Sequence, residues 1–220
     1  MKLPGQVAII NTASQYLGAK AGLAVMARVI SGLLFACIAT TLLIAGASTL
    51  TPLALAAPAA SAPNTPAPEF PHRHQSSWLN SPPLSLANLR GKVVLLDIWT
   101  TDCWNCYRSF AWLRRVTDRF AANGLVVIGV HSPEFEHEKD RRGIAARLAQ
   151  YQLTNPQMLD DDFSYWRRLG NQYWPAFYLI DKQGRIRELL VGEQHSGDRS
   201  ARNFEAAIET LLNEPLARRN

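Results

Sequence analysis

The sequence predicts one α/β domain with a mixed sheet, preceded by an apolar N-terminal segment and a linker. Two apolar runs rich in β-branched residues flank an amphipathic stretch, which is typical of a parallel strand–helix–strand unit. Two later apolar runs are joined by the polar turn Asp181-Lys182-Gln183-Gly184, which indicates an antiparallel hairpin. The first 57 residues contain no acid, so the chain changes character before the domain begins.

The composition excludes several classes of protein. Of 220 residues, 47% are hydrophobic and 19% are charged, which fits neither a disordered chain nor a polytopic membrane protein. The net charge is +5, but Lys2, Lys20 and Arg28 supply +3 of it before the domain. No basic stripe with interleaved aromatic residues is visible, so we expect no nucleic-acid partner.

The N-terminal segment predicts export or membrane anchoring. Val29–Leu50 contains 22 uncharged residues, enough for a helix of about 33 Å that would cross a bilayer. Ala54-Leu55-Ala56 provides a small-x-small cleavage site, so a signal peptide and an uncleaved anchor both stay open. Either way, the positive flank at Arg28 stays in the cytoplasm. We therefore assign 1–56 to a signal peptide or membrane anchor and expect the rest to be extracytoplasmic, secreted or tethered to the inner membrane by residues 29–50.

A Pro- and Ala-rich stretch follows the apolar segment. It cannot bury much apolar area and favours an extended backbone, so we assign 57–75 to a linker. The remainder, 76–213, is the predicted domain, and 214–220 is a C-terminal tail.

The first half of the domain predicts a parallel strand pair. Val93–Trp99 is an almost continuous apolar run, as expected of a strand buried on both faces. An amphipathic helix over Cys106–Ala122 follows, and Asn123-Gly124 is a good helix stop. The next buried strand, Leu125–Val130, is then parallel to the first through a right-handed crossover.

The second half predicts three more helices and the hairpin. Trp78–Leu86, before the first strand, is expected to be an irregular edge segment. The predicted helices are Asp140–Tyr151, Phe163–Leu169 and Ser200–Leu212, and the predicted hairpin strands are Ala176–Ile180 and Arg185–Val191.

The chemistry is expected at Cys103-Trp104-Asn105-Cys106, between a buried strand and the start of a helix. Residues three apart face the same way on a first helical turn, so the two sulfur atoms can approach bonding distance. A helix N-terminus favours a thiolate, and thiols in such pairs have pKa values of about 3.5–7.5. A purely structural disulfide and half of a zinc site are the weaker alternatives, because the loop is small and no second ligand pair exists.

The two cysteines have different predicted roles. Cys103 is expected to be the more exposed and to attack a partner disulfide, forming a mixed disulfide. Cys106, deeper in the first turn, is expected to resolve it and release a reduced partner. This chemistry needs only the two sulfur atoms, so we expect no cofactor and no metal.

Val93–Trp99 followed by Cys103-Trp104-Asn105-Cys106 resembles the strand and active site of thioredoxin-fold oxidoreductases, and Trp174-Pro175 is similar to their cis-proline. Residues 129–135 (GVHSPEF) and 171–176 (NQYWPA) look most like the extracytoplasmic thioredoxin-like domain of DipZ-type proteins, within the TlpA and redoxin group. The resemblance implies a thioredoxin fold, a central mixed sheet flanked by helices, over about residues 78–212.

The resemblance also implies roles for single residues. Asp97 lies where thioredoxins keep a buried acid that exchanges a proton with the resolving cysteine. Pro175 would hold a cis peptide bond opposite the cysteines and leave the backbone of Trp174 to pair with a bound peptide. Trp104, Asn105, Trp174 and Pro175 are the expected substrate-binding residues.

The chain also departs from these families. Ser109 and Ala111 stand where TlpA-like proteins often have Glu and Pro, so an acid that tunes the thiols is missing. Trp104-Asn105 replaces the Gly-Pro of thioredoxin, which leaves the direction of electron flow open. DipZ-type proteins fuse this domain to a multi-span electron-transfer domain, so the donor expected here is a separate membrane protein.

We expect an extracytoplasmic thiol-disulfide oxidoreductase that reduces disulfides in exported proteins, with apocytochromes among the candidate clients. A peroxide-reducing redoxin, with an antioxidant function, is the first alternative; Cys103 would then form a sulfenic acid that Cys106 resolves. A thiol-based copper or haem carrier is the second, although the chain has only three Met.

Overall fold

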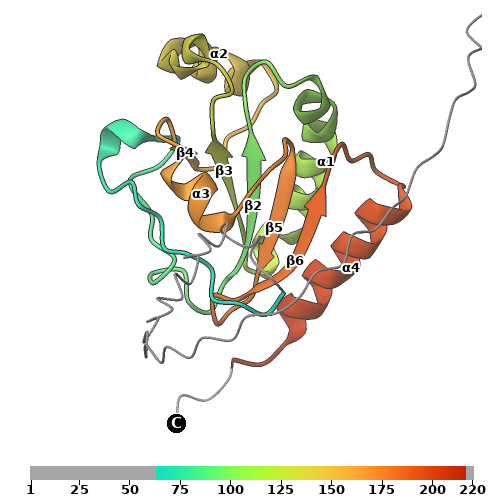
Figure 1. Ribbon diagram of the computed structural model, residues 1–220. Coiled ribbons are helices and arrows are strands. Elements are labelled where there is room, and N and C mark those ends of the chain that lie inside the picture. Colours follow the sequence, from blue (N-terminus) through green and yellow to red (C-terminus); the bar gives the residue numbers. More distant parts are fainter. Residues whose placement is uncertain (1–62, 217–220) are drawn as a thin grey trace, which may run out of the picture. The chain divides into compact units, whose positions relative to one another are not determined.

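The computed structural model describes residues 63–216 (Figure 1). The expected signal or anchor segment, with Cys37 and Ala54-Leu55-Ala56, lies outside the described residues, as do the first residues of the linker. Within 63–216, no helix has the length and apolar character needed to cross a membrane.

A six-stranded mixed sheet forms the centre of the domain, in the order β1-β4-β3-β2-β5-β6. β3 lies parallel to both β2 and β4, whereas β5 is antiparallel to β2 and β6, and β1 is antiparallel to β4. The predicted mixed sheet is thus confirmed. The strands are β1 (Trp78–Leu79), β2 (Val93–Trp99), β3 (Leu125–His131), β4 (Gln157–Leu159), β5 (Ala176–Ile180) and β6 (Ile186–Val191).

Helices cover both faces of the sheet (Figure 1). α1 (Trp104–Phe120), α2 (Arg141–Gln150) and α4 (Arg199–Asn213) contribute buried residues to the hydrophobic cluster on one face. α3 (Ser164–Leu169) packs with the segment before β2 against the other face. Three short 3-10 turns complete the fold: Gln75–Ser77, Ala121–Asn123 and Glu136–Lys139.

β2 is buried on both faces, as its apolar run predicts. Alternate side chains of a strand point to opposite faces. Val93, Leu95 and Trp99 therefore enter the cluster beneath α1, and Val94 and Leu96 enter the opposite one. β2 and β3 end at the same edge of the sheet, toward α2 (Figure 1). The loop that carries the two cysteines starts from this edge.

The shortest strands were not predicted. β4 has three residues and β1 has two, which is too short for an alternating pattern to be read. The segment expected to be an irregular edge thus contributes one of these strands, paired with β4. α1 begins at Trp104, two residues earlier than the predicted start, because Cys103 itself caps the helix.

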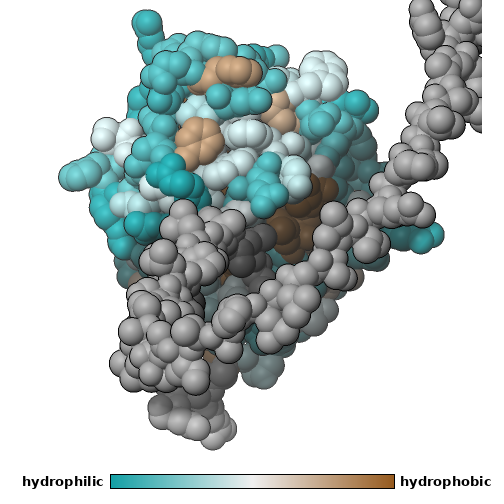
Figure 2. Space-filling view, viewed as in Figure 1, coloured by the Kyte–Doolittle hydropathy of each residue, from teal (hydrophilic) through white to brown (hydrophobic). Residues whose placement is uncertain are grey.

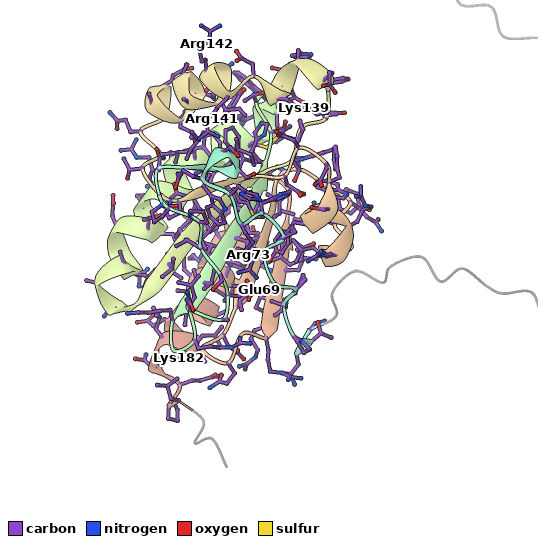
Figure 3. All side chains as sticks on the ribbon, turned by 90° about the vertical axis from the view of Figure 1, so that its left-hand side faces the viewer. Glu69, Arg73, Lys139, Arg141, Arg142 and Lys182 are labelled. Atoms are coloured by element: carbon purple, nitrogen blue, oxygen red, sulfur yellow. A yellow bond between two sulfur atoms is a disulfide. The ribbon has the colours of Figure 1, made fainter. Side chains whose placement is uncertain are left out.

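Residues 63–75 pack on the domain, which differs from the expected boundary at residue 76. Phe70 is 1% exposed and lies 5.7 Å from Trp78 and 5.3 Å from Tyr165, between ring centroids. The Glu69 carboxylate, near Arg73 in Figure 3, accepts hydrogen bonds from the backbone N–H groups of residues 86 and 87 at 2.7 and 3.0 Å. One large aromatic side chain thus anchors a stretch that its composition assigns to the linker.

Long cationic side chains tie loops to the two ends of the domain (Figure 3). At one end, the Lys182 Nζ donates to the carbonyls of Leu212 and Glu214 at 2.7 Å each, where α4 ends. At the other, Arg141 donates to the carbonyls of Ser76 and Trp78. The second end is the one toward which β2 and β3 run.

The surface is largely hydrophilic on the face drawn in Figure 2, with a hydrophobic patch over the region of β6. Leu189 and Val191 of β6 are 39% and 42% exposed. β6 is an edge strand of the sheet, so these side chains have strand neighbours on one side only.

Candidate active site

Cys103 and Cys106 form a disulfide at the N-terminus of α1. The S–S distance is 2.01 Å and the Cα atoms are 5.2 Å apart. Cys103 is the helix N-cap, and its sulfur accepts a hydrogen bond from the Cys106 backbone N–H at 3.1 Å. The same N–H also donates to the Cys103 carbonyl at 3.1 Å. The first helical turn thus holds the two sulfur atoms at bonding distance, as the three-residue spacing predicts.

The two cysteines differ in exposure. Cys106 is fully buried in the cluster beneath α1, whereas Cys103 is partly exposed at its edge. The first turn of α1 contains no acid, so no side chain of that turn offsets the positive end of the helix dipole. Of the two sulfur atoms, only that of Cys103 belongs to a partly exposed residue, and it lies at the N-terminus of α1.

Asp97 is a buried acid on β2. It is 1% exposed, and alternation along the strand places it on the face of Leu95 and Trp99, which pack in the same cluster as Cys106. Neither carboxylate oxygen has a hydrogen-bond partner among the described residues. Burial raises the pKa of Asp97 to about 8. At neutral pH most Asp97 side chains thus carry a proton, and a minor ionised fraction can accept one.

Trp99, at the end of β2, is fixed by a buried hydrogen bond. Its Nε1 donates to the Gln157 Oε1 at 2.9 Å, and its ring packs edge-on against Phe110 at 5.5 Å. Gly129, the β3 neighbour of Asp97, makes room for the Gln157 amide, because a Cβ there would lie 1.8 Å from its oxygen. The absence of a side chain at Gly129 lets the Gln157 amide of β4 reach Trp99.

The loop before β5 approaches the end of β2. Ala176 pairs with Ile98, so Pro175 and Trp174 lie one and two residues beyond the last paired position. The Trp174–Pro175 peptide bond is cis, as the resemblance implies. The Trp174 indole donates to the Ser132 carbonyl at 3.0 Å and its ring lies 4.2 Å from Trp166. Trp174 also packs, partly buried, against the cluster that contains Cys106.

Aromatic side chains are exposed around the disulfide. Trp104, between the two cysteines, is 68% exposed and Asn105 is exposed beside it. Phe135, in the loop after β3, and Tyr173, before the cis peptide bond, are 52% and 56% exposed. Because these segments and the cysteine loop lie at the same edge of the sheet, exposed aromatic rings gather at that edge.

Ser109 and Ala111, where a Glu and a Pro are common in TlpA-like proteins, have different surroundings here. Ser109 is buried, donates to the Asn105 carbonyl at 2.8 Å and accepts from the Gln194 N–H at 2.9 Å. Ala111 is exposed on a helix that continues to Phe120. Ser109 thereby ties the first turn of α1 to the segment that follows β6.

Sequence reasoning missed three polar residues near this edge. Gln157 belongs to a strand that was not predicted, and nothing local marks its contact with Trp99. His131 is fully buried 4.9 Å from Trp99, and burial lowers its pKa to about 4. Glu138 is 2% exposed, although the sequence shows it only as the third acid of an alternating charged run with Glu134 and Glu136.

His72, Asp160 and Asp162 form a second polar group. His72 Nε2 lies 3.0 Å from the Asp160 Oδ1 and 3.5 Å from the Asp162 Oδ1. Asp160 already accepts from the backbone N–H groups of Tyr165 and Trp166 at 2.9 and 2.8 Å. Asp160 therefore caps α3. It also binds His72, a residue that was predicted to lie in the linker, and so attaches this residue to the helix.

Comparison with protein families and curated proteins places the fold and the cysteine pair in a known context. The redoxin family profile matches residues 62–208. DipZ of Mycobacterium bovis and DipZ of Mycobacterium tuberculosis are each 39% identical over 142 residues, which are 63% of this chain and 20% of theirs. The chain thus spans about a fifth of the length of these relatives. The thiol-disulfide oxidoreductase YkuV of Bacillus subtilis is 28% identical over 54% of this chain and 79% of its own length.

Solved structures share the fold. The crystal structure of a thioredoxin-like superfamily protein is similar with a TM-score of 0.61 at 25% identity, over 70% of this chain and 99% of that one. The solution structure of a thioredoxin-like protein in the oxidized form is similar with a TM-score of 0.57 at 25% identity, over 68% and 95%. The expected thioredoxin-like fold is confirmed.

Proposed function

Because the chain belongs to the redoxin family, we propose that it is a thiol-disulfide oxidoreductase that reduces disulfides in other proteins through Cys103 and Cys106. The observation that carries the proposal is the asymmetry of the pair. One sulfur is partly exposed at a helix N-terminus, and the other is buried next to it. In this arrangement the partly exposed sulfur of Cys103 can attack a client disulfide, and the buried sulfur of Cys106 can then break the mixed disulfide.

The reaction takes two exchange steps. In the dithiol form, the Cys103 thiolate attacks one sulfur of a client disulfide; a mixed disulfide forms and the first client thiolate leaves. Cys106 then attacks the Cys103 sulfur, which breaks the mixed disulfide and releases the second client thiolate. The client gains two electrons and two protons, and the protein is left with the Cys103–Cys106 disulfide.

Asp97 is the proposed proton carrier for the second step. The Cys106 thiol must lose its proton before it can attack, and it lies in an apolar environment that disfavours the thiolate. Asp97 lies on the strand beneath the same cluster, and its raised pKa of about 8 is close to that of a thiol. The ionised fraction of Asp97 can therefore take the Cys106 proton with little change in free energy.

The client is proposed to bind at the edge of the sheet where the aromatic rings are exposed. Trp104 and Asn105 would contact the client beside its disulfide, and the backbone of Trp174 before Pro175 would pair with an extended client segment. These contacts involve the main chain of the client and uncharged side chains of this protein. They would therefore accept disulfide-bearing clients of many different sequences.

We also propose that the protein acts outside the cytoplasm. The support is the uncharged Val29–Leu50 segment behind Arg28, which is suited to export or anchoring. The clients would be exported proteins with disulfides, apocytochromes among them. Each cycle consumes two electrons, so a donor must reduce the Cys103–Cys106 disulfide again, and a separate membrane protein is the proposed donor.

Disulfide transfer can be tested directly against peroxide reduction. The full chain with Cys37→Ser is reduced, freed of reductant and mixed with insulin or with hydrogen peroxide. We expect one insulin disulfide to be reduced per protein oxidised, faster than by an equal concentration of a simple dithiol, and peroxide to disappear no faster than with that dithiol. Rapid peroxide consumption without insulin reduction would contradict the proposal and favour the peroxide-reducing alternative.

A further inference from the structure

Glu138 is a buried acid that the proposed chemistry does not use. It lies in the 3-10 turn Glu136–Lys139, where Glu134 and Glu136 are exposed while Glu138 is 2% exposed. A buried carboxylate costs free energy unless donors surround it. The donors around Glu138 therefore identify the segments of the chain that it joins.

The donors come from the loop that leads into Cys103. The Glu138 Oε1 accepts from the Thr100 hydroxyl at 2.6 Å, from the Asp102 backbone N–H at 2.8 Å and from the Thr101 hydroxyl at 3.3 Å. The Oε2 accepts from the Phe135 backbone N–H at 2.7 Å. One carboxylate therefore joins every residue between β2 and Cys103 to the loop after β3.

Among residues 63–216, no cationic side chain forms an ion pair with Glu138. Burial by itself would raise the pKa of Glu138, but the hydrogen bonds from Thr100, Phe135 and Asp102 outweigh it and hold the pKa below its usual value. Nearby cationic side chains are paired elsewhere, His137 with Asp102 and Lys139 with Glu136. His131 interacts electrostatically with the same carboxylate, but burial lowers its pKa to about 4, which leaves it neutral at pH 7. A fixed negative charge thus lies beside the loop that carries Cys103.

We propose that Glu138 is a positioning residue for the cysteine pair, which fixes the loop before Cys103 and, through its charge, makes the pair a stronger reductant. The inference rests on the proposed function and concerns the same site. A negative charge near Cys103 disfavours the thiolate of the reduced form and leaves the neutral disulfide unaffected. Since stabilising the reduced form makes a pair oxidising, disfavouring it makes the pair reducing.

The equilibrium with glutathione measures this effect without a client. Two glutathione thiols each give up one electron and one proton, the protein S–S bond breaks, and glutathione disulfide and two protein thiols form. Above its pKa, Cys103 then releases its proton to solvent. All variants are made in the full chain with Cys37→Ser, so Cys103 and Cys106 are the only cysteines left to form a disulfide.

Three variants of Glu138 and one control separate charge from shape. Glu138→Gln keeps the size and removes the charge, and Glu138→Ala removes both, so either one tests the charge if the other does not fold. Glu138→Asp keeps the charge on a shorter side chain. Glu136→Gln removes the same charge from an exposed position two residues away.

We expect Glu138→Gln and Glu138→Ala to shift the equilibrium about tenfold toward the dithiol, which corresponds to about 30 mV for a two-electron couple. The midpoint of the pH dependence of Cys103 alkylation is expected to fall by about one pH unit. Glu138→Asp and Glu136→Gln are expected to stay within about twofold of the parent chain.

Parent-like equilibria and alkylation midpoints in the neutral Glu138 variants would overturn the inference, as would an equal shift in Glu136→Gln. A loss of thermal stability with unchanged equilibria would show a structural role only, which also contradicts it. Failure of the parent chain to reduce insulin would instead contradict the proposed function, and the glutathione equilibria would still report on Glu138.

Discussion

Cys106→Ser, made in the Cys37→Ser chain, is expected to stay covalently bound to its clients. Cys103 can still attack a client disulfide, but the buried serine hydroxyl cannot displace the client from the mixed disulfide. Cys103→Ser is expected to bind no client, because Cys106 is fully buried and cannot be reached by a client disulfide. Both variants should lose multiple-turnover reduction by at least about 10³-fold.

The trapped species is measured by non-reducing electrophoresis after mixing with a disulfide-bearing protein. A band at the summed mass that disappears with dithiothreitol is the expected result for Cys106→Ser. Equal trapping by Cys103→Ser would reverse the assigned roles. Turnover that survives the loss of either cysteine would remove the two-step mechanism altogether.

Asp97→Asn is expected to slow the second exchange step by about 10²-fold and leave the first one nearly unchanged. The first step uses the partly exposed Cys103, which can release its proton to solvent, whereas Cys106 depends on a buried proton acceptor. Rapid mixing with a model disulfide, followed by acid quenching, separates formation of the mixed disulfide from its resolution. Equal slowing of both steps would contradict the proposed role of Asp97.

The same substitution is expected to change stability in a pH-dependent way. The native state keeps the Asp97 proton up to a pKa of about 8, whereas the unfolded chain releases it near 3.8. The native state thus binds more protons between these values, so the free energy of unfolding falls as pH rises through this window. Asp97→Asn removes that loss, on the order of 5 kcal/mol by pH 8, and has little effect near pH 4.

Denaturant unfolding of the oxidised protein checks this, since no thiol of the pair titrates in that form. The control is Asp118→Asn, which removes an exposed acid from α1 and should leave the pH profile as it was. A stability difference that does not grow between pH 4 and pH 8 would contradict the raised pKa of Asp97.

The central strands and the cysteine pair were predictable from sequence because their signals are local. The apolar run Val93–Trp99 became β2 without a change of boundary, and the hairpin strand Ala176–Ile180 became β5. The three-residue spacing of the cysteines was enough to place a disulfide on the first turn of a helix. Each of these features depends on residues that are neighbours in the chain.

The missed features depend on contacts between distant residues. β4 is three residues long and is stabilised by its place beside β3. Phe70 lies in a segment whose composition predicts a linker, and only its packing against Trp78 and Tyr165 shows that it belongs to the domain. Glu138 differs from Glu136 only in the donors that the cysteine loop brings to it, which no pattern in the charged run reveals.

The reduction potential of the Cys103–Cys106 pair in the full chain with Cys37→Ser tests the central claim most directly. The protein is equilibrated in defined glutathione or dithiothreitol buffers, and the two forms are separated by thiol alkylation. We predict a potential at or below about −230 mV, in the range of reducing thioredoxin-like proteins. A value between about −120 and −180 mV would indicate an oxidant or isomerase and contradict the proposed direction of electron flow, and failure to form the disulfide would contradict the dithiol mechanism itself.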